Sequence, residues 1–170
     1  MKQYRCFVGL GSNLEDPLQH MQQAILAFFQ HADFTSCVTS SLYQTTPVGP
    51  VPQDDFLNAV IAFTTTYSPT TLLAWLQQLE QQHQRRRLVK WGPRTLDADL
   101  LLHGQEIVNT PQLQIPHPEM KNRSFVLVPF AEIAPNWVLP SGECMQDLLR
   151  NSDLLAVKKL STPIQAVLSN

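Results

Sequence analysis

The segment 91–102, with the sequence WGPRTLDADLLL, holds the pattern around which the rest of the chain is arranged. From Leu96 to Leu102, apolar residues alternate with Asp97 and Asp99, which predicts a β-strand with an apolar face and both aspartates on the other face. Side chains two positions apart on a strand lie roughly 7 Å from each other, and carboxylates at that distance repel unless a cation or a proton lies between them. Mg²⁺ commonly binds one or two carboxylates together with phosphate oxygens. The strand therefore predicts a magnesium site, the alternative being two ordinary aspartates at a solvent-facing edge.

A cluster of basic residues precedes this strand, and its members are Arg85, Arg86, Arg87, Lys90 and Arg94. Arginine side chains pair with phosphate oxygens through two parallel hydrogen bonds, and Trp91 can stack on a nucleobase. Taken alone, the cluster could be a solvated loop or helix end. Next to the aspartate pair, it favours a site for a nucleoside triphosphate.

Composition limits the class of protein. The chain has 170 residues, of which 44% are hydrophobic and 15% charged, and this predicts a soluble globular protein. We expect a single domain over residues 1–160, followed by a C-terminal tail at 161–170. The net charge of −2 gives no overall field that would attract nucleic acid.

Cysteine spacing and hydropathy indicate the cellular compartment of the protein. Cys6, Cys37 and Cys144 are scattered and odd in number, which argues against a disulfide framework and fits a reducing cytoplasm. No run of apolar residues is long enough to span a membrane, and the N-terminal segment is interrupted at Gly11 before a signal-peptide core could form. We therefore expect a cytoplasmic protein, and a monomer.

The periodicity predicts an α+β fold. Before residue 104 the expected order is strand, helix, strand, strand, helix, strand, which is the split βαβ pattern of a ferredoxin-like sandwich with an antiparallel sheet and helices on one face. Residues 104–160 are predicted to form an irregular C-terminal extension with a short strand and two short helices. The strands are expected at 4–10, 34–43, 56–66, 96–102 and 106–108, and the helices at 17–29, 69–83, 125–131 and 145–149.

Two segments between these elements are candidate binding loops. Residues 45–55 contain three prolines and one glycine, and loops of that length in a compact domain are usually functional or disordered. The basic stretch 85–90 is the second long loop. Gly9, Gly11, Ser12 and Asn13 are predicted to form a tight turn, but the pattern matches neither the dinucleotide-binding fingerprint nor the P-loop, so an ATP site here uses neither of those glycine-rich motifs.

Five segments together resemble the 6-hydroxymethyl-7,8-dihydropterin pyrophosphokinase family of the folate pathway. They occur in the family's order over all of the chain except the C-terminal tail, and the last two are highly specific. The segments are 11–13, 45–49, 56–58, 91–99 and 116–125.

The resemblance implies an ATP-dependent diphosphotransferase. In that family a pyrophosphoryl group moves from ATP to the hydroxymethyl group of the pterin, and AMP leaves. The resemblance also implies a ferredoxin-like fold and two Mg²⁺ ions held by Asp97 and Asp99. Arg85 and Arg94 would be catalytic together with the aspartates. Residues that contact the phosphates would be Arg85, Arg87, Arg94, His117 and Arg123. Residues around the adenosine would be Gln77, Glu80, Trp91 and Leu100.

The same resemblance implies a pterin pocket. Phe56 and Phe125 would stack on the two faces of the pterin, Asn58 would hydrogen-bond its edge, and backbone groups of Thr45 and Val48 would supply further contacts. The alternative is that the two phenylalanines are ordinary core residues and that Asn58 is a buried amide with protein partners.

Four departures from the family pattern affect the loops and the nucleotide contacts. The family commonly has tyrosine at Phe56 and arginine at Lys90, and the loop between Arg87 and Lys90 is one residue shorter. Pro118 stands where an aromatic residue is frequent. Two other functions remain open at this point, namely a phosphotransferase with a different acceptor and a ferredoxin-like module that binds nucleic acid.

Overall fold

The structure, a computed structural model, describes residues 1–47, 49–83, 95–154 and 157–160. Its main element is a six-stranded sheet with the order β5-β1-β4-β3-β8, in which β2 also pairs with β4. Every strand pair of this sheet is antiparallel, as predicted. The strands of the sheet are β1 (Tyr4–Ser12), β2 (Thr35–Thr39), β3 (Tyr43–Thr45), β4 (Phe56–Thr65), β5 (Asp97–His103) and β8 (Val157–Lys159).

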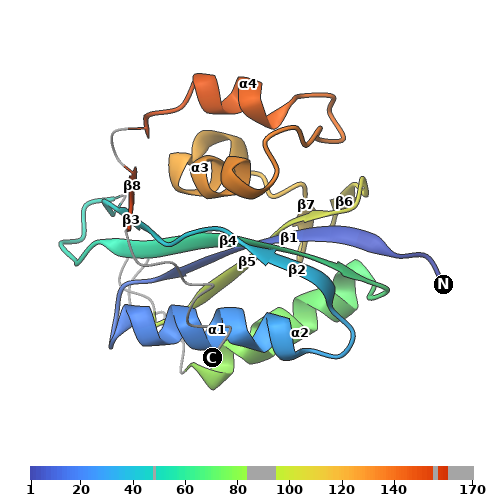
Figure 1. Ribbon diagram of the computed structural model, residues 1–170, viewed down its shortest axis with the longest axis horizontal. Coiled ribbons are helices and arrows are strands. Elements are labelled where there is room, and N and C mark those ends of the chain that lie inside the picture. The colour runs from blue at the N-terminus through green and yellow to red at the C-terminus, as the bar shows by residue number, and fades with distance from the viewer. Residues whose placement is uncertain (48, 84–94, 155–156, 161–170) are drawn as a thin grey trace.

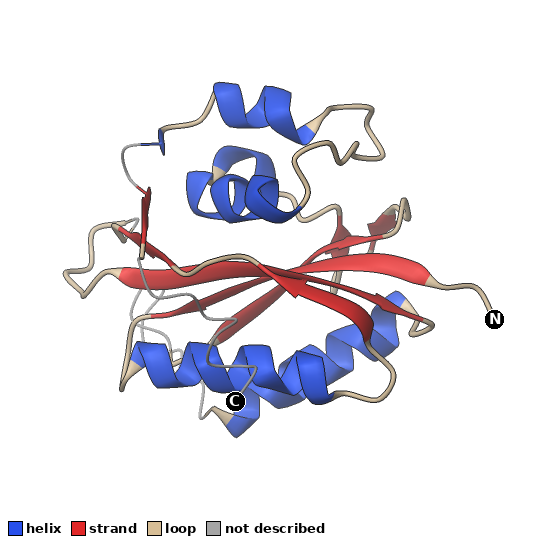
Figure 2. Cartoon of the chain, viewed as in Figure 1, coloured by secondary structure: helices blue, strands red, loops and turns tan. Residues whose placement is uncertain are grey.

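Helices cover both faces of this sheet (Figures 1 and 2). The helices α1 (Pro17–Gln30) and α2 (Pro69–Gln82) lie on one face, as the split βαβ pattern predicts. The C-terminal extension adds α3 (Ser124–Ile133) and α4 (Met145–Arg150) on the opposite face. The predicted α+β class and antiparallel sheet are thus confirmed, but the placement of helices on one face alone holds only for α1 and α2.

Between β5 and α3 the chain forms a small hairpin and a helical turn. The hairpin consists of β6 (Val108–Asn109) and β7 (Gln114–Ile115), and the turn is a 3₁₀ helix, η1 (Met120–Asn122). None of the helices within the described residues is both long and apolar enough to cross a membrane.

The starts of the two long helices follow from local sequence. The side chain of Asp16 accepts a hydrogen bond from the backbone N–H of Gln19, and Pro17 occupies the first helical position of α1. Ser68 does the same for Thr71 at the start of α2, where Pro69 follows. Such caps satisfy backbone donors that have no partner within the helix, and proline is favoured at the first position because its missing N–H is not needed there.

The first hydrophobic core lies between the sheet and these helices. It contains the periodic apolar residues of α1 and α2 and the alternating residues of β1, β4 and β5 that face them. Leu96, Ala98 and Leu100 belong to it, as the alternation around Asp97 and Asp99 predicts.

One residue of that alternation faces the other way because β5 contains a β-bulge. Val8 pairs with Leu100 but the preceding Phe7 pairs with Leu102, so Leu101 is an extra residue on β5. Leu101 and Leu102 both belong to the second core, on the α3 side of the sheet. The prediction that Leu102 shares a face with Leu96 was therefore wrong, because an inserted residue reverses the alternation beyond it.

Other boundaries also differ from the sequence prediction, and the short strand expected at 106–108 is β6 at Val108–Asn109. The segment around Gly9 and Gly11 is not a turn, because β1 continues to Ser12. It pairs with β4 along its whole length and with β5 from Cys6 to Gly11. The predicted strand 34–43 is divided into β2 and β3. At the interruption Ser40 forms two hydrogen bonds with Val60, from its backbone N–H to the Val60 carbonyl and from the Val60 N–H to its hydroxyl.

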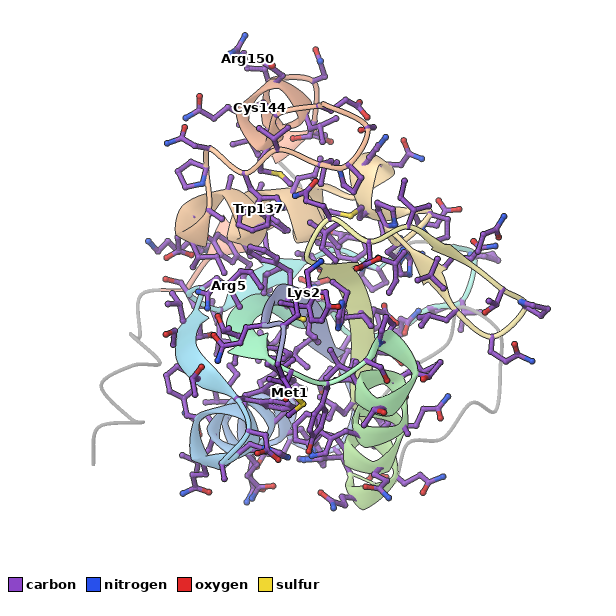
Figure 3. The ribbon with its side chains drawn as sticks, turned by 90° about the vertical axis from the view of Figure 1, so that its right-hand side faces the viewer. Met1, Lys2, Arg5, Trp137, Cys144 and Arg150 are labelled. Atoms are coloured by element: carbon purple, nitrogen blue, oxygen red, sulfur yellow. The ribbon has the colours of Figure 1, made fainter. Side chains whose placement is uncertain are left out.

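The second core covers only part of the opposite face. Phe7, Val60, Leu101 and Leu102 pack there against α3, where Phe130 stacks on Phe7 with ring centroids 4.2 Å apart. The ring of Trp137 meets Phe7 edge-on at 4.8 Å. Figure 3 shows Trp137 on the α3 side of the sheet, with Cys144 and Arg150 progressively farther out. The rest of this face carries polar residues, glycines and Phe56.

A hydrogen-bonded carboxylate joins α3 to the sheet. Glu132 accepts hydrogen bonds from the backbone and hydroxyl of Ser41 at 2.9 and 2.7 Å and from the hydroxyl of Tyr43 at 2.8 Å, and Lys159 of β8 lies 3.7 Å away. Burial by itself would raise the pKa of Glu132, but these hydrogen bonds and the charge of Lys159 outweigh it and hold the pKa below its usual value.

We predict that this carboxylate stabilises the fold in a pH-dependent way. Its contribution should be complete above the unfolded pKa of about 4.5 and should be lost as the pH falls through the lower folded pKa. Glu132→Gln should lower the midpoint of thermal unfolding by about 3–6 °C at neutral pH, the effect of losing charged hydrogen bonds in a chain of this size. Thermal unfolding followed by circular dichroism between pH 3 and pH 8 measures this difference.

Glu106→Gln is the matched control, since within the described residues the Glu106 side chain makes no ion pair. If the unfolding midpoints of wild type and Glu132→Gln differ by the same amount down to pH 3, the assignment is contradicted.

Candidate active site

Two glycines of β1 lie on the α3-side face of the sheet, among the residues that the sequence predicts for the site. Gly9 and Gly11 of β1 pair with Asp99 and Asp97 of β5, and on the other side Gly11 pairs with Asn58 of β4. Residues directly opposite each other in an antiparallel pair point to the same face. The two aspartates and Asn58 therefore border a strip on which β1 presents only hydrogen atoms.

Asp97 and Asp99 are half-buried, and both lie on this face, as the strand pattern predicts. Within the described residues there is no cluster of three or more His, Cys, Asp or Glu side chains that could hold a metal ion by itself. Two partly exposed carboxylates nevertheless suit Mg²⁺, which usually keeps several of its sites for water and substrate phosphate. The donor set thus fits Mg²⁺ shared with a phosphate ligand better than a metal held by protein groups alone.

Asn58 is buried and held in one orientation. Its Nδ2 donates to Oγ1 of Thr45 at 2.6 Å, and its Oδ1 would lie only 2.9 Å from a Cβ added at Gly11. The glycine at position 11 is therefore required by the close approach of this amide, and not by a turn. Thr45 contributes its side chain, whereas the sequence analysis considered only its backbone. One N–H and the carbonyl oxygen of the amide are left for a ligand.

Phe56 and Phe125 lie on the same side of the sheet as the aspartates. Phe56 begins β4 two residues before Asn58, and its Cδ1 is 3.8 Å from the Cβ position of Gly11. Phe125 is in the first turn of α3, where the guanidinium of Arg123 lies 5.6 Å from its ring centroid. Both rings are half-buried, so each presents part of its surface to solvent or a ligand.

A cavity of about 380 Å³ lies next to β5, which is an edge strand of the sheet. It brings together five of the predicted site residues, from α2, β5 and the segment after β7. These are Gln77, Glu80, Asp99, Leu100 and His117. The remaining lining residues are Leu73, Ala98, Pro111, Gln112, Leu113, Gln114 and Pro118.

Gln112 and Gln114 in this lining were not predicted from the sequence. They belong to the β6–β7 hairpin, which folds against the edge of β5, and no local motif distinguishes them from other surface glutamines. Their position at the cavity depends on the path of the chain after Gly104.

Glu80 also has a structural contact. Its side chain is buried, and Oε2 accepts a hydrogen bond from the backbone N–H of Ala98 at 3.1 Å. The last turn of α2 is thereby attached to β5 between the two aspartates. Glu80 thus lines the cavity and also fixes one wall of it.

His117 is oriented by its neighbours. Its backbone N–H donates to the carbonyl of Leu101 at 3.0 Å, and its Nδ1 accepts from the backbone N–H of Glu119 at 3.1 Å. Burial lowers the pKa of His117, Arg123 acts in the same direction, and the charges of Asp99 and Glu119 oppose them. A neutral imidazole whose Nδ1 accepts a hydrogen bond carries its proton on Nε2, so His117 can donate one hydrogen bond from Nε2.

The end of β1 holds the two chain segments that flank the site. The hydroxyl of Ser12 donates to the carbonyl of Thr95 at 2.5 Å, just before β5. The Nδ2 of Asn13 donates to Oε1 of Gln53 at 2.8 Å and to the carbonyl of Asp54 at 2.9 Å, in the proline-rich loop. The sequence motif around Ser12 and Asn13 was noted, but these contacts were not predicted. Five predicted site residues lie outside the described residues: Val48, Arg85, Arg87, Trp91 and Arg94.

Comparison with known proteins relates this chain to a family. A family model for 7,8-dihydro-6-hydroxymethylpterin-pyrophosphokinase matches residues 7–135. The 2-amino-4-hydroxy-6-hydroxymethyldihydropteridine pyrophosphokinase of Haemophilus influenzae is 43% identical over 144 residues, which make up 85% of this chain and 90% of that protein. The enzyme of the same name from Bacillus subtilis is 45% identical over 127 residues, 75% of this chain and 76% of that protein.

Solved structures agree on the fold. The crystal structure of wild-type HPPK-DHPS from Plasmodium falciparum with pterin and p-hydroxybenzoate superposes with a TM-score of 0.68 at 13% identity. The superposition covers 88% of this chain but only 42% of that longer chain. The family match and the relatives above 40% identity show that this chain belongs to the 7,8-dihydro-6-hydroxymethylpterin-pyrophosphokinase family.

Proposed function

We propose that this chain, a pyrophosphokinase by its family, transfers the pyrophosphoryl group of ATP to the hydroxymethyl group of 6-hydroxymethyl-7,8-dihydropterin beside Asp97 and Asp99 of β5. The observation that carries the proposal is that a ligand-sized cavity beside Asp99 and Leu100 lies next to the row that Asp97, Gly11 and Asn58 form across β5, β1 and β4. A nucleotide in the cavity and a pterin at this row would have their reacting groups next to both carboxylates.

The reaction is a single in-line displacement. The pterin hydroxyl oxygen attacks the β-phosphorus of ATP, the bond between that phosphorus and the oxygen leading to the α-phosphate breaks, and AMP leaves. The hydroxyl proton passes to water. Phosphoryl-type transfer depends mainly on positioning and on neutralising charge, because the protein makes no covalent bond. Two Mg²⁺ ions held by Asp97 and Asp99 would neutralise the phosphate oxygens.

The nucleotide is assigned to the cavity. Gln77, Glu80 and Leu100 line it and would surround the adenosine. His117 would donate from Nε2 to a phosphate oxygen, and Arg123, whose charge acts on the same imidazole, would contact the phosphates as well. The family resemblance adds Trp91 to the adenosine contacts. It adds Arg85, Arg87 and Arg94 to the phosphate contacts, with Arg85 and Arg94 as catalytic residues.

The pterin is assigned to the row across β5, β1 and β4. A flat bicyclic ring can lie close to a strand without side chains, and Phe56 and Phe125 are the rings placed to stack on it. The oriented amide of Asn58 would pair with the polar edge of the pterin, as would backbone groups of Thr45 and Val48. We further propose that the protein acts as a monomer in the cytoplasm, where its three thiols would stay reduced.

We predict that Asp97→Asn lowers turnover by at least about 100-fold without unfolding the protein, because losing one metal-binding carboxylate removes charge neutralisation worth several kcal/mol. The assay mixes ATP, Mg²⁺ and the hydroxymethyl pterin with the protein and measures AMP. Asp147→Asn, which removes an exposed carboxylate paired with Arg150 on α4, is the matched control and should keep full activity. AMP formation by Asp97→Asn at the wild-type rate would refute the metal assignment, and its absence with wild-type protein would refute the proposed reaction.

Gly11→Ala is expected to weaken pterin binding by at least about 10-fold, because the new Cβ would displace the Asn58 amide from its position. The nucleotide affinity should stay within about twofold of the wild-type value, since the cavity lining does not include Gly11. Titration calorimetry with the pterin and a non-hydrolysable ATP analogue measures both. Thr45→Val, which removes the hydrogen bond to Asn58 at almost constant volume, should weaken pterin binding in the same selective way.

The two ligands should bind cooperatively. Ser12 and Asn13 attach the two loop segments to the same end of β1, so ordering one segment around a nucleotide should favour the arrangement of the other. We expect the pterin to bind at least about 5-fold more tightly in the presence of the ATP analogue and Mg²⁺. Equal pterin affinity with and without the analogue would count against this coupling.

A further inference from the structure

Two imidazole rings face each other where α1 lies beside the C-terminal end of α2. The Nδ1 atoms of His20 and His83 are 2.7 Å apart, and the ring centroids are 4.9 Å apart with an interplanar angle of 64°. At this separation one ring must carry a proton on Nδ1 and the other must present its lone pair. A tetrahedral metal ion bound to both nitrogens would need them about 3.3 Å apart, so the geometry favours a shared proton over a metal.

His83 occupies a critical position on α2. It is the C-cap residue, and its backbone N–H lies within hydrogen-bond distance of the carbonyls of Leu79 and Glu80 at 3.3 and 3.2 Å. One turn earlier Glu80 accepts a hydrogen bond from Ala98 of β5. The last turn of α2 is therefore fixed at two points, to the sheet through Glu80 and to α1 through His83.

This turn forms part of the cavity wall. Glu80 lines the cavity, and so does Gln77, which lies one helical turn before Glu80. Neither His20 nor His83 lines the cavity. Any effect of the histidines on a nucleotide must therefore be transmitted through the position of α2.

We propose that the hydrogen bond between His20 and His83 is a positioning contact that fixes the last turn of α2 for nucleotide binding. This inference rests on the proposed function, because it takes the cavity to be the nucleotide site. The histidines touch neither substrate, and removing their contact changes the affinity for the nucleotide without removing any group that binds it.

The contact has a built-in pH dependence. A second proton on the pair places N–H against N–H and breaks the hydrogen bond. Burial lowers the pKa of His83, and the nearby charge of His20 lowers it further. The hydrogen bond is therefore intact above the ordinary histidine pKa of 6.5 and is lost as the pH falls below it, through the lowered folded value. The charged residues nearest along the two helices are Glu15, Asp16 and Glu80, and Arg85, Arg86 and Arg87 follow α2 outside the described residues.

Two substitutions at His20 separate a hydrogen bond from simple packing. His20→Asn places an amide where Nδ1 was, and this amide can donate to or accept from His83 but does not titrate. His20→Leu fills similar space and makes no hydrogen bond. The dissociation constant of a non-hydrolysable ATP analogue with Mg²⁺ is measured for wild type and both variants between about pH 5.5 and pH 8, and imidazole ¹⁵N shifts of the wild-type protein are recorded at about pH 8.

At pH 8 we expect His20→Asn to bind the analogue as wild type does and His20→Leu to bind it about fivefold more weakly, the effect of one lost hydrogen bond. At pH 5.5 wild type should bind the analogue about fivefold more weakly than His20→Asn does. Because both proteins are compared at the same pH, protonation of the nucleotide itself affects both affinities equally. The ¹⁵N spectrum should show one protonated and one unprotonated Nδ1.

The inference is overturned if wild type binds the analogue but all three proteins share one pH profile, or if both Nδ1 atoms prove unprotonated. In either case the proposed function still stands. If wild type binds no analogue at any pH, the proposed function fails, and the inference fails with it.

Discussion

The pairing of β1 with β4 on one side and β5 on the other is the constraint on which the site depends. It aligns Asp97, Gly11 and Asn58 in one row across three strands that are far apart in the sequence. Because position 11 has no side chain, the Asn58 amide can lie against the backbone of β1. A larger residue at this position would displace the amide.

The β-bulge divides β5 into a part that carries the two site aspartates and a part that packs in the second core. Before the bulge, Asp97 and Asp99 lie on the α3-side face while their neighbours fill the first core. At the bulge, Leu101 and Leu102 both turn toward α3 and close the second core. The helix therefore packs on the apolar part of this face, and Asp97 and Asp99 beside it are only half-buried. A small site of this kind suits a small ligand, whereas a nucleic-acid-binding sheet needs a broad exposed face with aromatic residues.

The position of α2 links the fold to the nucleotide cavity. Glu80 attaches its last turn to β5, and the pairing of His83 with His20 attaches it to α1. A helix terminus is the part of a helix most prone to fraying, since its last carbonyls have no partners within the helix. Two side-chain contacts at this end therefore matter for a wall that must present Gln77 and Glu80 to a ligand.

The sequence by itself determined the strand that carries Asp97 and Asp99, the starts of α1 and α2, and the family, because alternation, capping residues and short motifs are local properties. Only the tertiary structure decided that Gly9 and Gly11 lie within a strand, that Leu102 turns away from Leu96, and that α3 covers part of the second face. It also brought Gln112, Gln114 and the His20–His83 pair into place. These features depend on strand pairing and on contacts between residues distant in the chain, which no local pattern records.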